Sequence, residues 1–137
     1  DNLRPRLGVV KGMFKDASDH IAWANFESVV QKAANNGATV IEFDPSDTFE
    51  RARTAQYIIQ RSEFASYQEE NYNKWPHLYS PVSRSWVEHG KVFTGVDYIN
   101  AQRIRSLFIE EMRSFLSQVD VLLTPSTPAA APAAPDV

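Results

Sequence analysis

The feature that most constrains the fold of this chain is a short apolar run near its end. There Val121-Leu122-Leu123 breaks into a Thr-Pro-Ser-Thr-Pro segment over residues 124–128. A short apolar run bounded by prolines is typical of a buried strand that delivers a loop to the rim of a sheet. Since Val-Leu-Leu offers no polar side to water, we expect the strand, over residues 120–124, to lie inside a sheet.

An earlier stretch has the pattern of a strand, a helix and a second strand. Residues 6–12 form a short apolar run weakened by glycines, and residues 38–43 form a β-rich run. Between them, Asp16 and Asp19 are expected to cap a helix, and Gly37 to supply the permissive backbone beyond its end. Such a unit favours parallel strands with a right-handed crossover. The expected buried face of this helix consists of Ile21, Ala22, Phe26, Val29, Val30 and Ala33.

Three further helices are expected. One should run from about residue 48 to 73 after a cap at Asp47, and another over 81–91. The last should open at Thr94, whose hydroxyl and the Asp97 carboxylate fit a capping box. Its expected apolar face consists of Ile99, Ile104, Leu107, Phe108, Met112, Phe115, Leu116 and Val119. The sequence therefore predicts an α/β protein with a mixed or mostly parallel sheet and flanking helices.

Composition narrows the class of protein. The chain has 137 residues, 43% of them hydrophobic, as expected for one globular domain. Its formal net charge is −3 with no basic stripe, which argues against a nucleic-acid partner. No apolar run approaches the ~20 residues of a membrane span, and the first residues do not form a signal peptide. The chain has no cysteine, which excludes disulfides and thiolate catalysis. The cytoplasm is taken as the default compartment.

Several short segments follow one another in a specific order. They are Leu7-Gly8-Val9-Val10, Gly37-Ala38-Thr39-Val40, the group Glu63, Phe64, Ala65 and Tyr67, the group Gly90, Thr94, Asp97, Tyr98, Ile99, Ala101 and Arg105, and the closing run Val119–Pro128. Each segment alone is weak. The ordered set resembles the later part of the amidase signature hydrolases, over nearly the whole chain.

The resemblance implies part of the family's αβα fold, formed by residues 1–128. The Ala/Pro-rich composition of residues 129–137 predicts an extended or disordered tail. In that family a Ser nucleophile, a second Ser in a cis peptide and a Lys base lie on an earlier Gly/Ser-rich signature. No segment of this sequence has that character. We therefore expect no catalytic residue in this chain. The complete enzyme would hydrolyse a small-molecule amide through an acyl-enzyme, and this portion would support the fold and the substrate pocket.

Two hypotheses of different classes remain open. In the first, the chain is a fragment whose partner is the missing catalytic segment or another copy of itself. Exposed apolar sheet edges and self-association would then be expected. In the second, it is an independently stable α/β module derived from an amidase, which works in binding or assembly. That hypothesis predicts a monomer that unfolds cooperatively.

Three residues are candidates for substrate binding. Arg84 could pair with a substrate carboxylate, although a surface ion pair is the commoner role for such a residue. Trp86 lies in the same segment, and core packing is its alternative. Thr127 lies at a strand exit, where a proline-stiffened turn would use its hydroxyl locally.

No cofactor or metal site is expected. His77 and His89 are twelve residues apart and do not form a helical ligand pair. A Ser–His–Asp triad built on His20, His77 or His89 would be a chance combination, because no Gly-x-Ser-x-Gly motif presents a serine. A further group of residues fits the lining of an apolar funnel or, more commonly, a core: Tyr57, Phe64, Tyr67, Tyr72, Trp75 and Tyr79.

Overall fold

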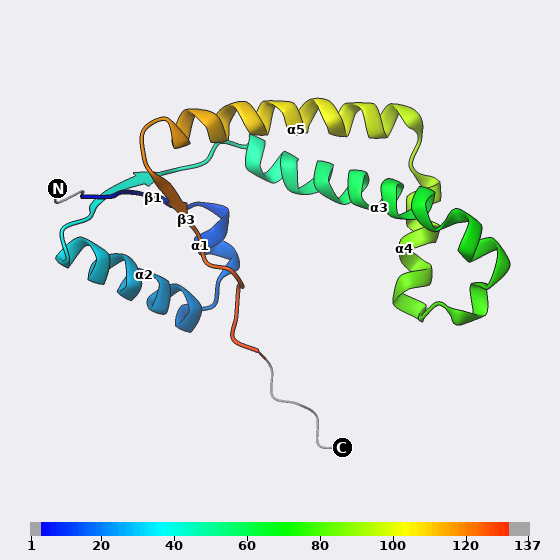
Figure 1. Ribbon diagram of the computed structural model, residues 1–137, viewed down its shortest axis with the longest axis horizontal. Coiled ribbons are helices and arrows are strands. Elements are labelled where there is room, and N and C mark those ends of the chain that lie inside the picture. Colours follow the sequence, from blue (N-terminus) through cyan, green and yellow to red (C-terminus); the bar gives the residue numbers. More distant parts are fainter. Residues whose placement is uncertain (1–3, 132–137) are drawn as a thin grey trace, which may run out of the picture. The chain divides into compact units, whose positions relative to one another are not determined.

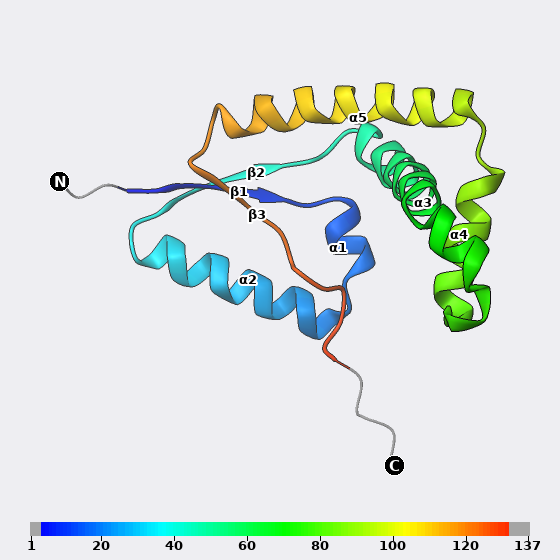
Figure 2. The same ribbon diagram turned by 45° about the vertical axis from the view of Figure 1, so that its right-hand side comes forward.

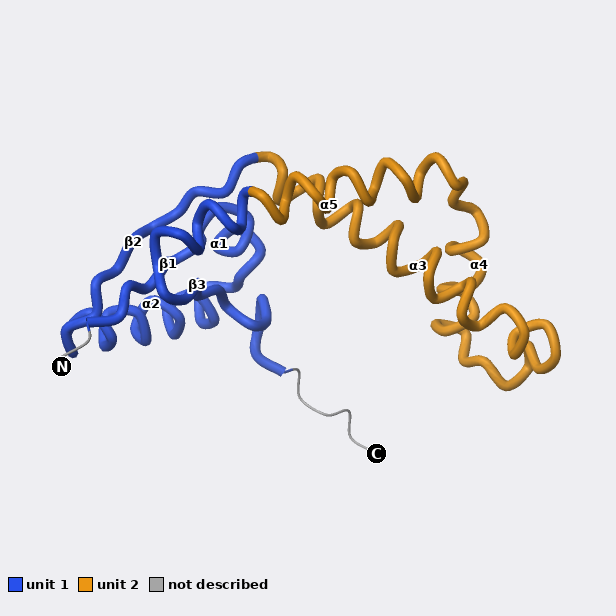
Figure 3. Tube along the Cα trace, turned by 45° about the horizontal axis from the view of Figure 1, so that its top comes forward, with its two compact units in different colours: residues 1–46, 111–137 blue, residues 47–110 orange. Residues whose placement is uncertain are grey.

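The computed structural model describes residues 4–131, and the expected tail beyond 131 lies outside that range. The chain forms two compact units (Figure 3). Unit 1 combines the residues up to Ser46 with those from Glu111 onward, and unit 2 holds residues 47–110. Unit 1 contains the sheet, and unit 2 consists of helices and turns.

The sheet of unit 1 has three parallel strands in the order β2-β1-β3 (Figure 1). They are β1 (Arg6–Val10), β2 (Thr39–Phe43) and β3 (Val121–Leu123). In the register of the central strand, Gly8 lies opposite Ile41 on one side and Leu122 on the other. The predicted α/β class and the parallel pairing are both confirmed.

The prediction that the last strand lies inside a sheet is wrong for the part of the chain that the structure describes. Here β3 pairs with β1 alone and forms an edge, and Val121 is 41% exposed. Its apolar sequence matches burial on both faces, which in a parallel sheet normally goes with neighbours on both sides. A strand of this composition at an edge leaves main-chain groups and apolar side chains uncovered.

Two helices follow β1. The short α1 (Met13–Ala17) was not predicted, and α2 (His20–Asn35) begins after Asp19, whose carboxylate accepts a hydrogen bond from the Ala22 N–H at 2.7 Å. Of the two expected caps, Asp19 is thus confirmed, whereas Asp16 lies inside α1. Gly37 ends this region with φ 98°, as predicted for a residue just past a helix.

The buried face of α2 differs from the prediction. The helix lies along one face of the sheet (Figure 2), and the side chain it buries there is Trp23. Ile21 and Val29 are not buried against the sheet but line an open pocket together with the segment that follows β3, and their side chains are 55% and 60% exposed. Fewer residues of α2 are therefore buried against the sheet than its apolar residues at helical spacing predict.

The opposite face of the sheet is covered by the end of α5 (Gly95–Leu116) within unit 1. Phe43 stacks on Phe115 with ring centroids 4.5 Å apart. A side chain at Gly8 would meet Leu122, Phe43 and Val119, the nearest atom at 2.5 Å. Glycine therefore fits this position without displacing the side chains that converge on the central strand, whereas any Cβ would force them to shift.

Unit 2 is built from α3 (Thr48–Lys74), the 3₁₀ turn η1 (Pro76–Leu78), α4 (Pro81–Val92) and the first part of α5. The three predicted helices are confirmed. The predicted cap at Asp47 is wrong, because this residue already has helical angles and its side chain makes no capping hydrogen bond. The Thr94–Asp97 box is confirmed: the carboxylate accepts from the Thr94 N–H at 2.8 Å, and the Asp97 N–H donates to the Thr94 hydroxyl at 3.1 Å.

The face predicted for α5 is only partly covered. Ala101 is buried and Phe108 contacts Phe49 edge to face at 4.9 Å, but Ile99 and Leu107 are about half exposed (53% and 49%). Leu116, in unit 1, is 48% exposed. The apolar stripe is wider than the surface that the described residues bury.

Close packing of α3 against α4 holds unit 2 together. Val87 is fully buried, and Gly90 lets the two helices approach, since a Cβ there would lie 2.0 Å from the Arg61 carbonyl oxygen. The Arg61 guanidinium lies over the Trp86 ring, 3.4 Å from its centroid, and also faces Tyr57 at 4.8 Å. Aromatic faces attract the cation, so this stack joins the two helices.

Candidate functional site

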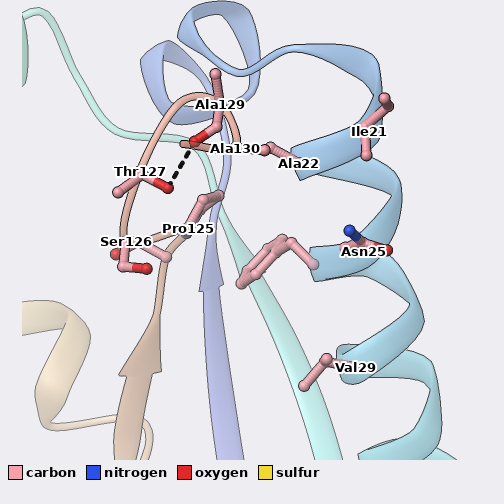
Figure 4. Close-up of a pocket in the computed structure, with 11 residues that line it drawn as sticks. Ile21, Ala22, Asn25, Val29, Pro125, Ser126, Thr127, Ala129 and Ala130 are labelled. Carbon is pink, nitrogen blue, oxygen red and sulfur yellow. Dashed lines mark hydrogen bonds between the residues drawn. The ribbon is translucent and has the colours of Figure 1, made fainter. Parts of the chain in front are cut away.

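The loop that leaves β3 forms a pocket with α2, which we call the strand-exit pocket (Figure 4). Its volume is about 350 Å³. The lining residues are Ile21, Ala22, Asn25, Phe26, Val29, Thr124, Pro125, Ser126, Thr127, Ala129 and Ala130. The loop after the strand and one side of the helix therefore form a concave, mostly apolar surface, as in many small-molecule sites.

Two contacts hold the loop in place. The Asp19 N–H donates to the Pro128 carbonyl at 2.7 Å, which ties the loop to the start of α2. The Thr127 hydroxyl donates to the Ala129 carbonyl at 3.0 Å (Figure 4). The prolines restrict the remaining backbone freedom. The loop that forms one wall of the pocket is therefore held by one hydrogen bond to the start of α2 and one hydrogen bond within the loop itself.

The start of β3 is fixed as well. Asp120 accepts hydrogen bonds from the Arg6 main-chain N–H and from its Nη2, both at 2.8 Å. These bonds from Arg6 hold the pKa of the Asp120 carboxyl below its ordinary value and raise the pKa of Arg6. The first residue of β1 is thereby bound to the residue that precedes β3, which sets where the strand-exit loop begins.

The polar groups of the strand-exit pocket are neutral. Its lining contains no Lys, His, Asp or Glu, and within residues 4–131 the Ser126 hydroxyl and the Asn25 amide make no side-chain hydrogen bond that would occupy them. A hydroxyl needs an adjacent base to become a nucleophile. The pocket can therefore contact an apolar group and hydrogen-bond an amide, but its lining has no group to activate Ser126.

The other two predicted site residues lie in unit 2. Arg84 is exposed on α4 and its Nη2 donates to the Pro76 carbonyl at 3.1 Å, which ties α4 to η1. Trp86 is half-buried between Arg61 and Phe64, whose ring centroid is 5.6 Å away. Thr127 belongs to unit 1, so the structure does not group the three residues within one unit.

The histidines do not assemble a catalytic set with serine in the described part. His89 Nδ1 lies 3.0 Å from the Tyr57 hydroxyl, while His20 begins α2 and His77 lies in η1. Across residues 4–131, no group of three or more His, Cys, Asp or Glu residues is placed to hold a metal ion. The same range contains no helix with the length and apolar character that crossing a membrane requires.

Sequence reasoning missed two residues of interest. Asn25 was passed over because it stands among apolar neighbours on α2, yet it lines the strand-exit pocket. Arg61 lies in a long helix rich in charged residues, and its Nε and Nη1 are buried without a hydrogen-bond partner. No local spacing distinguishes a stacked arginine from a solvated one, so this feature required the structure.

Comparison with known proteins decides the family. The family model described as Amidase matches residues 2–137. The chain belongs to the amidase family. An amidase from Pseudomonas putida is 27% identical over 123 residues, which are 90% of this chain and 26% of that protein.

Two solved structures have the same fold as this amidase-family chain. A crystal structure of an amidase gives a TM-score of 0.84 at 24% identity, over 96% of this chain and 30% of that one. A chain of a structure described as an unexpected vestigial protein complex, which reveals the origins of an s-triazine catabolic enzyme, gives 0.80 at 25% identity, over 93% and 27%. The resemblance predicted from the ordered segments is confirmed, and the chain spans about a quarter of the length of the curated relative above.

Proposed function

We propose that this chain is part of an amidase that hydrolyses carboxylic amide bonds of small molecules, and that the nucleophile comes from residues outside this chain. In such a reaction a serine oxygen attacks the amide carbonyl, the amine leaves, and water then hydrolyses the acyl ester. The family membership supports amide hydrolysis. The shares of 26–30% of the relatives' lengths leave ample room for a catalytic segment elsewhere.

The observation that carries this proposal is the strand-exit pocket. It offers apolar surface and neutral hydrogen-bonding groups, which suit an uncharged amide, and its lining holds no base for Ser126. A pocket of this kind binds and orients a substrate but does not activate a nucleophile. The chain would therefore supply a wall of the substrate site.

The open edge of β3 is a second support. Its apolar side chains and unpaired main-chain groups, with Val121 41% exposed, fit a strand that gains a further neighbour in the complete protein. The partner in this proposal is the catalytic segment of the same enzyme. Thr127 would then belong to the wall of the substrate site, and Arg84 and Trp86 stay proposals as selectivity residues.

The test uses the complete enzyme and a panel of aliphatic and aromatic primary amides. Asn25→Leu and Ser126→Ala change the pocket wall but leave the loop contacts of Asp19 and Thr127 intact. We expect each to raise KM about three- to tenfold, the loss of one hydrogen bond, with little change in kcat. Ser114→Ala, on the exposed side of α5, is the matched control. Unchanged KM values for every amide that is hydrolysed would reject this role.

The second candidate function is a non-catalytic binding or assembly module. The relation to a chain from a protein complex favours it, as do exposed apolar side chains such as Leu78 and Val92 (72% and 77%). Sedimentation of the isolated chain separates the two ideas. A monomer with one cooperative unfolding transition supports the module, and concentration-dependent association supports the fragment.

A further inference from the structure

Unit 2 contains a second cavity of about 370 Å³, which we call the helix-corner cavity. One wall is the middle of α3, and the other is the segment where α4 ends and α5 begins. Its volume falls in the range of about 300–1,000 Å³ that is usual for small-molecule sites. None of its lining residues belongs to the strand-exit pocket.

The α3 wall of this cavity is polar. Ser62, Ser66 and Glu69 are spaced by four and then three residues, so they lie on one face of the helix, and all three line the cavity. A helix face turned toward another element is normally apolar. Here apolar contact comes from Ala65 and, across the cavity, from Phe93.

Ser62 differs from other helical serines in this chain. The hydroxyls of Ser85 and Ser106 donate to the carbonyl three or four residues earlier, at 2.8 and 3.1 Å. The Ser62 hydroxyl is buried and has no hydrogen-bond partner among the described residues. Such groups are rare in folded proteins, because their desolvation is not compensated. A rotamer change can turn this unused donor toward the cavity.

Opposite charges face the cavity without pairing. The residues Glu69 and Lys91 both line it, and neither forms an ion pair within residues 4–131. Lys91 Nζ lies 5.3 Å from the centroid of the Tyr72 ring, on the same helix as Glu69. The adjacent Glu70, by contrast, pairs with Lys74. The lining of the cavity therefore contains one positive and one negative side chain that are not paired, together with the hydroxyls of Ser62 and Ser66.

We propose that the helix-corner cavity binds a small zwitterionic amino acid. Its carboxylate pairs with Lys91, its ammonium group with Glu69, and the hydroxyls of Ser62 and Ser66 form hydrogen bonds with these same charged groups. Such a ligand gives each of these two unpaired side chains a charge-assisted hydrogen bond. This inference does not depend on amide hydrolysis, because binding needs no nucleophile.

Calorimetric titration of the 137-residue chain tests the proposal. The probes are glycine, β-alanine, 4-aminobutyrate and 6-aminohexanoate, a series in which the separation of the two charges increases. We expect one or two members to bind with a Kd on the order of 1 mM, as suits so few atoms. Butyrate and butylamine, which carry one charge each, should bind about tenfold more weakly than the best zwitterion.

Variants locate the binding. Glu69→Gln and Lys91→Met should each weaken it about tenfold, and the controls Glu110→Gln and Lys32→Met, which lie outside the cavity, should not change it. Ser62→Ala should weaken binding severalfold without lowering the Tm, a result that a purely structural hydroxyl would not give. Absence of binding up to about 50 mM, well above that Kd, overturns the proposal. So does full binding in either charge variant that circular dichroism shows to be folded.

Discussion

Replacing Gly90 with alanine should destabilise unit 2 although alanine is the better helix former. The added Cβ would lie 2.0 Å from the Arg61 carbonyl oxygen and 2.5 Å from the Ala65 Cβ. Backbone atoms cannot give way as a flexible side chain can, so α3 and α4 must separate. Overpacking of this kind costs about 1–3 kcal/mol or more, while the helix propensity of alanine returns about 1 kcal/mol. Because the clash is with backbone, the cost lies at the upper end of this range, about 3 kcal/mol, and the net expectation is a loss of about 2 kcal/mol.

Urea unfolding followed by the fluorescence of Trp86, in a background where Trp23 and Trp75 are phenylalanine, reports on this contact. Gly95→Ala is the matched control, because this glycine begins α5 and a Cβ there meets nothing within 4 Å. We expect the control to be neutral or slightly stabilising. A Gly90→Ala chain as stable as its parent would refute the argument that this glycine permits the close approach of the two helices.

Three further predictions concern local contacts. Thr94→Ala should destabilise unit 2 by about 1 kcal/mol through loss of the cap of α5, measured by the same unfolding assay; no change would mean that the box is not formed in solution. Gly8→Ala should destabilise unit 1, because its Cβ meets Leu122 at 2.5 Å, and a near-ultraviolet spectrum identical to the parent would contradict this. Hydrogen bonds lower the pKa of the Asp97 and Asp120 carboxyls in the folded chain. The two carboxylates therefore stabilise the fold fully above the ordinary Asp pKa of about 3.9, and this contribution is lost as the pH falls through the lowered pKa values. Melting in buffers from about pH 6 to 2 should show this loss, which Asp120→Asn should reduce.

Local signals in the sequence were sufficient for most of the secondary structure. The capping box at Thr94, the cap at Asp19 and the backbone of Gly37 depend on bonds within a few residues, and the structure has all three. The parallel strands follow from the strand–helix–strand pattern. Asp47 failed as a cap because its own backbone angles, which the sequence does not reveal, are helical.

Burial was harder to predict than helix and strand. Apolar residues at helical spacing mark a face, but how much of it is covered depends on what the rest of the protein places there. Ile21 and Val29 line an open pocket, and Val121 lies on an edge strand. The stack of Arg61 on Trp86 and the unpaired Glu69 and Lys91 depend on side chains far apart in sequence. No pattern within one segment contains that information.

The central claim, that this chain belongs to an amidase without supplying its nucleophile, is tested most directly with a fluorophosphonate that labels activated serines. The folded chain, with and without a panel of primary amides, would be analysed by intact mass and for released ammonia. The account predicts an unmodified mass near 15.5 kDa and no ammonia. Stoichiometric labelling of one serine in this chain, together with amide turnover that its replacement by alanine abolishes, would contradict it.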